Sequence, residues 1–314
     1  MEAKNMIEFL HYNLSYILSG ISVGGQYALI AIGYTMVYGI LRLINFAHGD
    51  VFMWAGLMMI YMVTWVPIYI AIPLVILGTV LLGFIIERVA YKPLRSAPRM
   101  SVMISAIGVS YLLQNAALYF TGGLAKVYPT IPWLSKNIVI WDAPTKMVTV
   151  VTPILTIVLV FVLVLLIKHT KIGMAMRAVS KDFETSSLMG IKVNTVISVT
   201  FVIGSLLAAI GSLLYFTNYA SVQPTSGAMP GLKCFVAAVF GGIGSIPGAV
   251  VGAFIIGICE NIIKGLDSML VTTGAISNPL GLSTFSDAFT FVLLIVILLV
   301  KPTGLFGEKS TDKV

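Results

Sequence analysis

Residues 154–167 read ILTIVLVFVLVLLI, and they run directly into KHTKIGMAMRAVSKDFETSSLMGIKVN at 168–194. A second apolar run, TVISVTFVIGSLLAAIGSLLYF, follows at 195–216. The two apolar runs are almost free of charge, whereas the segment between them is strongly charged. Long uncharged runs are typical of membrane-spanning helices, so this pattern predicts two spans joined by a polar segment outside the membrane.

The polar segment 168–194 has the periodicity of an amphipathic helix. The apolar face carries Met176, Val179 and Phe183, and the charged face carries Arg177, Lys181 and Glu184. We therefore expect one face to pack on the membrane domain and the other to meet a soluble partner. An ordinary solvated loop between two spans is the alternative interpretation.

The whole chain has the composition of a membrane protein. Of its 314 residues, 58% are hydrophobic and 10% are charged, whereas soluble domains carry about 25% charged residues. Windows long and apolar enough for a crossing lie at 14–40, 51–66, 68–87, 101–121, 151–167, 195–216, 233–263 (interrupted) and 286–300. We predict a single all-α integral membrane domain over residues 1–314, with about eight transmembrane helices.

The net charge of +7 is concentrated in a few loops, so it does not indicate a nucleic-acid-binding protein. Lys and Arg gather in the loop 88–99, in the segment 168–194 and after residue 300. Because cytoplasmic loops are enriched in Lys and Arg, we expect all three to be cytoplasmic. An even number of crossings must then separate 168–194 from the tail, so 233–263 is expected to form a re-entrant hairpin or two short spans.

Glycine and proline interrupt one apolar window near 240–248. Residues 240–257 read FGGIGSIPGAVVGAFIIG, with glycines at 244, 248 and 252 on one helical face where another helix can approach closely. Gly241, Gly242 and the turn around Ser245 would stop a helix within the membrane. Irregular backbone at that depth is tolerated only where protein covers it or a polar cavity solvates it, which points to a transport path. Close helix packing alone is the alternative.

A second interruption, LINFAHGD at 43–50, precedes the apolar helix that starts at Val51. Asn45 could cap this helix, and free amides at such an end favour the carboxylate of a ligand. His48 could relay protons, although a lone His beside a membrane helix is more often a packed, hydrogen-bonded residue. The sequence leaves both alternatives open.

Several motifs are missing from the sequence. It has no GxxxxGK[ST] phosphate loop, no HExxH and no GxSxG, so we expect no ATP hydrolysis by this chain and no enzymatic activity. Cys234 and Cys259 lie in apolar surroundings without metal-ligand spacing, so no metal site or cofactor is expected. The sequence shows no acid at mid-membrane depth, which a proton-coupled carrier would normally need.

Five segments, in the same order and without a large insertion, resemble the permease subunits of branched-chain amino acid ABC importers, the Liv-type H subunits. They are YALIAIGYTMVYGILRLINFAHGDVFM (27–53), ERVAYKPLRSAPRMSVMISAIGVSYLLQN (87–115), KIGMAMRAVSKDFETSSLMGI (171–191), FVAAVFGGIGSIPGAVVGAFIIGICE (235–260) and LLVKPTGLFG (298–307). Any one of these motifs would be a weak signal, but five colinear motifs make a specific one.

The resemblance implies a multi-pass permease in the bacterial cytoplasmic (inner) membrane that imports branched-chain or related hydrophobic amino acids. Its partners would be a second homologous permease, two cytoplasmic ATPase subunits that bind ATP and Mg, and an extracytoplasmic solute-binding protein. Two other functions remain open. Permeases for urea or short amides look much alike, and an ATP-independent secondary carrier would need no docking segment.

The resemblance also implies roles for residues of this sequence. Segment 168–194 is similar to the loop that docks on an ATPase subunit, and its candidate coupling residues are Lys171, Gly173, Arg177, Lys181, Asp182, Glu184 and Gly190. The two interruptions match glycine-rich signatures of the family at Asn45, His48, Gly49, Gly241, Gly242, Gly244, Ser245 and Gly248. That these eight residues line the translocation path is our own inference from the breaks.

Overall fold

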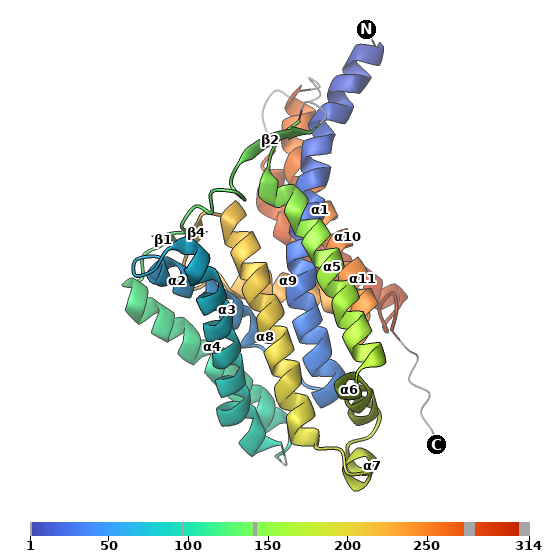
Figure 1. Cartoon of the computed structure of the whole chain (residues 1–314). Helices are drawn as coiled ribbons and strands as arrows, with labels where there is room; N and C mark the ends of the chain where they lie inside the picture. The colour runs from blue at the N-terminus through green and yellow to red at the C-terminus, as the bar shows by residue number, and fades with distance from the viewer. Residues whose placement is uncertain (1, 96, 141–142, 273–279, 308–314) are drawn as a thin grey trace.

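The computed structural model describes residues 2–95, 97–140, 143–272 and 280–307, which fold into a bundle of helices (Figure 1). Seven helices in these ranges are long and apolar enough to cross a membrane. They are built on α1 (Glu2–Leu41), α3 (Ile68–Ile86), α4 (Arg99–Thr121), α5 (Met147–His169), α8 (Val193–Asn218), α10 (Ile246–Thr272) and α11 (Ser286–Val300). Two shorter helices, α2 (His48–Met62) and α9 (Ala228–Gly241), pack among them. The predicted all-α membrane architecture is confirmed, but the predicted span 51–66 forms the 15-residue α2, which is not one of the seven long helices.

α1 is the central helix of the bundle. Every residue from Ser22 to Val37 is buried, and α1 packs against α5, α8, α9 and α10. A Cβ at Gly24 would lie 2.8 Å from the Cα of Phe254, and one at Gly257 would lie 2.5 Å from the Cα of Gly24. α1 and α10 therefore meet backbone to backbone, which only small residues allow.

α10 presents small residues to two different neighbours. Gly248 and Gly252 face α9, where an added Cβ would come within 3.0 Å of the backbone of Gly241, whereas Gly257 faces α1. The predicted close approach is therefore present at Gly248 and Gly252. The prediction was wrong for Gly244, which precedes α10, has a φ of +99° and has open space where a Cβ would lie.

Both predicted interruptions are breaks in the helical backbone. α1 ends at Leu41 and α2 begins at His48, and α9 ends at Gly241 and α10 begins at Ile246. The window 233–263 therefore belongs to two helices, α9 and α10, that pack against each other.

The connections carry short elements that the sequence did not predict, because pairings of two to four residues leave no periodic pattern. Two-stranded antiparallel sheets join β1 (Lys126–Val127) to β4 (Ser221–Val222) and β2 (Asn137–Ile140) to β3 (Ala143–Lys146). The strand β2 lies towards one end of the molecule, and α6 (Lys171–Lys181) and α7 (Phe183–Leu188) lie at the other (Figure 1). Two short helical turns, η1 (Glu87–Tyr91) and η2 (Lys92–Leu94), follow α3. A third, η3 (Leu282–Phe285), precedes α11.

We predict that Gly257→Ala destabilises the bundle by about 1–3 kcal/mol, because its new methyl group would overlap the backbone of Gly24. Thermal unfolding of the purified protein in detergent should show a lower Tm. Gly108→Ala is the matched control, since Gly108 is helical and exposed and an added Cβ meets no atom within 4 Å. Equal melting temperatures for the two variants would contradict the close contact of α1 with α10.

Candidate functional site

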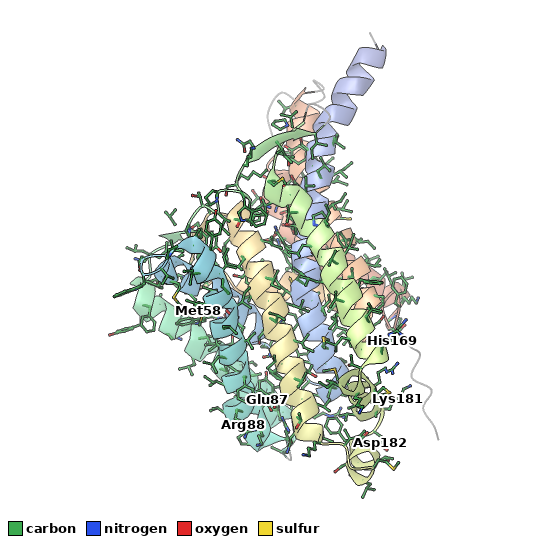
Figure 2. All side chains as sticks on the ribbon, viewed as in Figure 1. Met58, Glu87, Arg88, His169, Lys181 and Asp182 are labelled. Carbon is green, nitrogen blue, oxygen red and sulfur yellow. The ribbon has the colours of Figure 1, made fainter. Side chains whose placement is uncertain are left out.

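Three basic segments meet at one end of the molecule, which we call the basic end: residues 87–99, 168–194 and 301–307. The side chain of Arg95 hydrogen-bonds to Glu87 and to Asn194, which ties the first segment to the second. A cavity lined by Lys168 and Pro302 joins the second to the third. Figure 2 shows Arg88, Lys181 and Asp182 at this end. Lys309 and Lys313, also counted in the basic tail, lie outside the described residues.

α6 is held against the bundle by a tight turn from α5. Thr170 caps α6, its Oγ1 accepting a hydrogen bond from the backbone N–H of Gly173 at 3.0 Å. A Cβ at Gly173 would lie 2.3 Å from the carbonyl oxygen of Ile167, so a larger residue would force the turn open. Met176 and Val179 are buried, as the helical wheel predicted, and the charged face remains exposed at Lys171, Arg177 and Lys181.

The predicted single amphipathic helix is two helices, because Asp182 adopts an extended conformation between α6 and α7. Its carboxylate caps α7 by accepting hydrogen bonds from the backbone N–H of Thr185 at 3.1 Å and from the Thr185 hydroxyl at 2.6 Å. Phe183 therefore belongs to α7 and is exposed, so its predicted place on the buried face was wrong. Glu184 lies in the first turn of α7 and is exposed.

Exposed apolar side chains lie at the C-terminal end of α7, at the basic end of the molecule. Leu188 is 87% exposed and Met189 is 79% exposed, directly before Gly190, whose φ of +83° ends the turn. Exposed apolar side chains rimmed by charge mark surfaces that bind other proteins. α6 and α7 together therefore form a surface suited to docking a partner.

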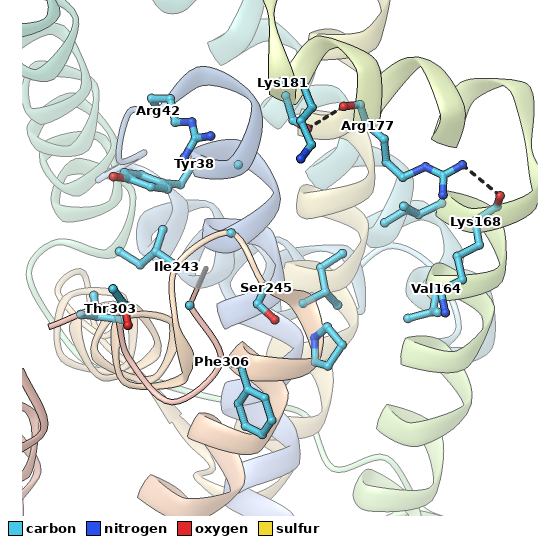
Figure 3. A pocket seen from close by; sticks show the side chains of 18 of the residues that line it. Tyr38, Arg42, Val164, Lys168, Arg177, Lys181, Ile243, Ser245, Thr303 and Phe306 are labelled. Atoms are coloured by element: carbon cyan, nitrogen blue, oxygen red, sulfur yellow. Dashed lines mark hydrogen bonds between the residues drawn. The ribbon is translucent and has the colours of Figure 1, made fainter. Parts of the chain in front are cut away.

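Beneath α6 lies a cavity of about 810 Å³, which we call the basic cavity (Figure 3). Its charged lining residues are all cationic: Arg42, Lys168, Arg177 and Lys181. The Arg177 guanidinium donates a hydrogen bond to the Lys168 carbonyl oxygen at 3.2 Å, which holds α6 to the end of α5. Gly244 and Ser245, from the break between α9 and α10, line the opposite wall. Two predicted coupling residues thus face two predicted path residues across one cavity.

The break itself is closed by the chain segment that follows α11. Leu305 and Phe306 donate backbone hydrogen bonds, each 2.9 Å long, to the carbonyl oxygens of Phe240 and Gly241. These carbonyls end α9 and would otherwise lack partners. Gly242 has a φ of +106°, and a Cβ there would lie 2.4 Å from the backbone nitrogen of Gly307. Gly241, Gly242 and Gly248 therefore lie in backbone contacts, and none of them lines the basic cavity.

The 43–50 break is held by side chains rather than by a cap. The sequence suggested that Asn45 caps α2, but its side chain forms no cap. Its Oδ1 instead accepts a hydrogen bond from the Tyr91 hydroxyl at 2.8 Å. His48 is buried and packs edge-on against the ring of Tyr34, with 4.9 Å between ring centroids. The described cavities are lined by neither Asn45 nor His48, whereas Gly49 does line one.

The cavity at Gly49, which we call the Asp50 cavity, has a volume of about 370 Å³ and lies between α1, α2, α4 and α9. Asp50 is 2% exposed, and its carboxylate accepts hydrogen bonds from the Ser110 hydroxyl at 2.5 Å and from Gln114 Nε2 at 3.1 Å. The sequence analysis gave Asp50 no role and did not predict that its carboxylate is buried. The available signal was the acid at the start of an apolar helix, but its partners on α4 lie about sixty positions away in the sequence.

A narrow void of about 10 Å³ lies between the Asp50 cavity and the basic cavity. It shares Tyr34, Ile44 and Phe235 with the first, and Tyr38 and Ile243 with the second. The three spaces therefore form a row that runs from the Asp50 cavity to the basic end. The row is constricted at the void by aromatic and aliphatic side chains.

A second charge cluster lies around the buried carboxylate of Glu260. Its carboxylate pairs with Lys233 at 2.8 Å and with Lys264 at 2.5 Å, and Lys233 also pairs with Asp287 at 2.6 Å. The Tyr27 hydroxyl donates to Glu260 at 3.0 Å. Two cations and two carboxylates balance, so this cluster is neutral. The sequence analysis missed it, although a single Lys in the apolar window of α9 was the visible signal.

The chain is similar to a known protein family and to several characterised permeases. Residues 16–300 match the family described as "Branched-chain amino acid transport system / permease component". The high-affinity branched-chain amino acid transport system permease proteins BraD of Pseudomonas aeruginosa and LivH of Escherichia coli are each 38% identical to this chain, over 98% of it and 100% of the relative. The ribose import permease protein RbsC of Haemophilus influenzae is 28% identical over 76% of this chain and 74% of its own length.

We predict that Asp182→Ala loosens α7, because the hydrogen bonds from Thr185 to the carboxylate are lost. The same bonds lower the pKa of Asp182 below its usual value, so the cap is present at neutral pH and is lost as the pH falls through that lowered pKa. Amide hydrogen exchange of residues 183–189 should become faster in Asp182→Ala at pH 7. Asp182→Asn is the control, since Asn also caps helices well. Unchanged exchange in Asp182→Ala would show that Asp182 does not hold α7.

Proposed function

The chain belongs to the family of branched-chain amino acid transport system permease components, and we propose that it is the permease subunit of an ATP-driven importer of branched-chain amino acids. In this proposal two cytoplasmic ATPase subunits bind ATP and Mg, a second homologous permease completes the membrane part, and an extracytoplasmic binding protein delivers the solute. The membrane is the bacterial cytoplasmic membrane. The basic end then faces the cytoplasm, in agreement with the enrichment of Lys and Arg in cytoplasmic segments.

The observation that carries the proposal is the row of cavities that ends beneath α6. One wall of the basic cavity belongs to the docking surface, through Arg177 and Lys181, and the other belongs to the break, through Gly244 and Ser245. Ile243 lines both the basic cavity and the constriction. A movement of α6 therefore has a short mechanical connection to the narrowest part of the row.

The proposed coupling uses this connection. Segment 168–194, within the single domain 1–314, docks on an ATPase subunit through the apolar tip of α7 and the charged face of α6. Closure of the ATPase subunits displaces α6 relative to the bundle. The glycine-rich backbone at 242–245 then shifts, and the side chains at the constriction move apart. The solute passes from the Asp50 cavity towards the basic end.

The walls of the row suit a hydrophobic amino acid. The constriction is lined by Ile44, Phe235 and Ile243 together with Tyr34, Thr35, Tyr38 and Ala238, so a branched aliphatic side chain keeps apolar contacts as it passes. Urea and short amides offer little apolar surface to such walls, which disfavours the alternative permease. An ATP-independent carrier would have no use for the exposed apolar side chains of Leu188 and Met189.

Uptake of labelled leucine into proteoliposomes tests the proposal, with this chain reconstituted together with its second permease, ATPase subunits and binding protein. We expect uptake that requires ATP and is competed by isoleucine and valine but not by urea. Competition by urea would assign the chain to the amide permeases. Uptake without ATP would instead assign it to the carriers and overturn the coupling.

We predict that Arg177→Glu lowers ATP-driven uptake by about tenfold while the complex still hydrolyses ATP, because it reverses a charge on the docking surface and removes the hydrogen bond that holds α6 to α5. Uptake and phosphate release are measured on the same proteoliposomes. Arg99→Glu is the matched control, since Arg99 is exposed at the basic end but lies outside segment 168–194. Uptake by Arg177→Glu at the control level would remove the docking role of α6.

A further inference from the structure

We propose that the Asp50 cavity is a binding site for the ammonium group of the transported solute, with Asp50 as its counter-ion. This inference rests on the proposed function and names the chemistry that the path recognises. The site would also bind aliphatic primary amines that carry no carboxylate.

The first support is an acid without a cation. Asp50 accepts hydrogen bonds from Ser110 and Gln114, both neutral, and the described residues place no Lys, Arg or His within ion-pairing distance of it. The cluster around Glu260 shows what this protein does elsewhere, since that buried acid has two lysine partners. Buried charges inside a membrane domain are costly unless they are paired, and they face a polar cavity or a partner. Asp50 therefore lacks a positive charge that a bound solute can supply.

The second support is the shape of the cavity. Its volume of about 370 Å³ is at the lower end of the range for small-molecule sites, about 300–1,000 Å³. Apolar groups, including Ile44, Phe46 and Leu232, line it beside the carboxylate. A carboxylate on one side and aliphatic and aromatic walls on the other match a solute with an ammonium group and a branched aliphatic chain.

The third support is the position of the cavity. It begins the row that leads through the constriction to the basic cavity. Gly227, which precedes α9, and Ala228, its first residue, also line the cavity, so the positive end of the α9 dipole lies beside the space where a solute carboxylate would sit. A zwitterion thus meets a negative group and a positive helix end in one cavity.

A cysteine-protection experiment tests the proposal on the full complex in lipid nanodiscs, without ATP. Ile107→Cys places a thiol in the cavity lining, in a Cys259→Ser background where the remaining Cys234 is buried. The rate of modification by N-ethylmaleimide is measured with L-leucine, with 3-methylbutylamine, which keeps the ammonium group, and with 4-methylpentanoate, which keeps only the carboxylate. We expect leucine and the amine to slow the reaction several-fold and the acid to leave it unchanged.

Asp50→Asn should raise the amine concentration needed for half protection by about tenfold or more, since a charged hydrogen bond is replaced by a neutral one. Asp287→Asn is the matched control, because it also turns an acid into an amide but lies in the other cluster. Unchanged protection in Asp50→Asn, or equal protection by the amine and the acid, would overturn the proposal. The comparison of amine with acid needs no change at Asp50, so it decides the matter even if Asp50→Asn misfolds.

Failure of the proposed function would look different. Protection requires neither ATP nor turnover, whereas the importer is tested by ATP-driven uptake with unaltered Asp50. A complex that protects the thiol but takes up no leucine keeps the ammonium site and loses the importer. A complex that takes up leucine but shows no protection keeps the importer and loses the site.

Discussion

The backbone contact between α1 and α10 is the constraint on which the rest of the structure depends. In a bilayer the hydrophobic effect does not drive two apolar helices together, so close packing has to supply the attraction. Gly24 and Gly257 allow that packing by removing the side chains between two backbones. α10 in turn fixes α9 through Gly248 and Gly252, and α9 carries one wall of the Asp50 cavity. The contacts of α1 with α10 and of α10 with α9 therefore set the positions of the break between α9 and α10 and of the cavities.

A break inside a membrane domain requires partners for its free carbonyl groups. Here the partners come from the far end of the chain, where Leu305 and Phe306 bind the last carbonyls of α9. The contact is specific to glycine on both sides, because Gly242 and Gly304 have positive φ values and approach each other too closely for a Cβ. The segment after α11 is therefore a structural part of the break, and any movement of the break has to carry that segment with it.

Charge is distributed in three different ways in this molecule. Cations at the basic end line an open cavity, the cluster around Glu260 is neutral, and Asp50 is buried with neutral donors only. The first arrangement suits a surface that meets soluble partners, and the second ties α9, α10 and α11 together. The third leaves one buried negative charge for a solute, and an unpaired buried charge in a membrane domain is costly.

The sequence by itself determined the membrane class, every predicted span except 51–66, both breaks and the charged face of α6, because long apolar runs, glycines and clustered Lys and Arg are local patterns. It did not determine that Asp182 splits the docking segment, since one extended residue inside a helical pattern leaves no periodic signal. Nor did it relate Asp50 to Ser110, or Lys233 to Glu260. Those pairs are distant in the chain, and only the packing of α2 on α4 and of α9 on α10 brings them together. Tertiary structure alone decided which buried charges have partners.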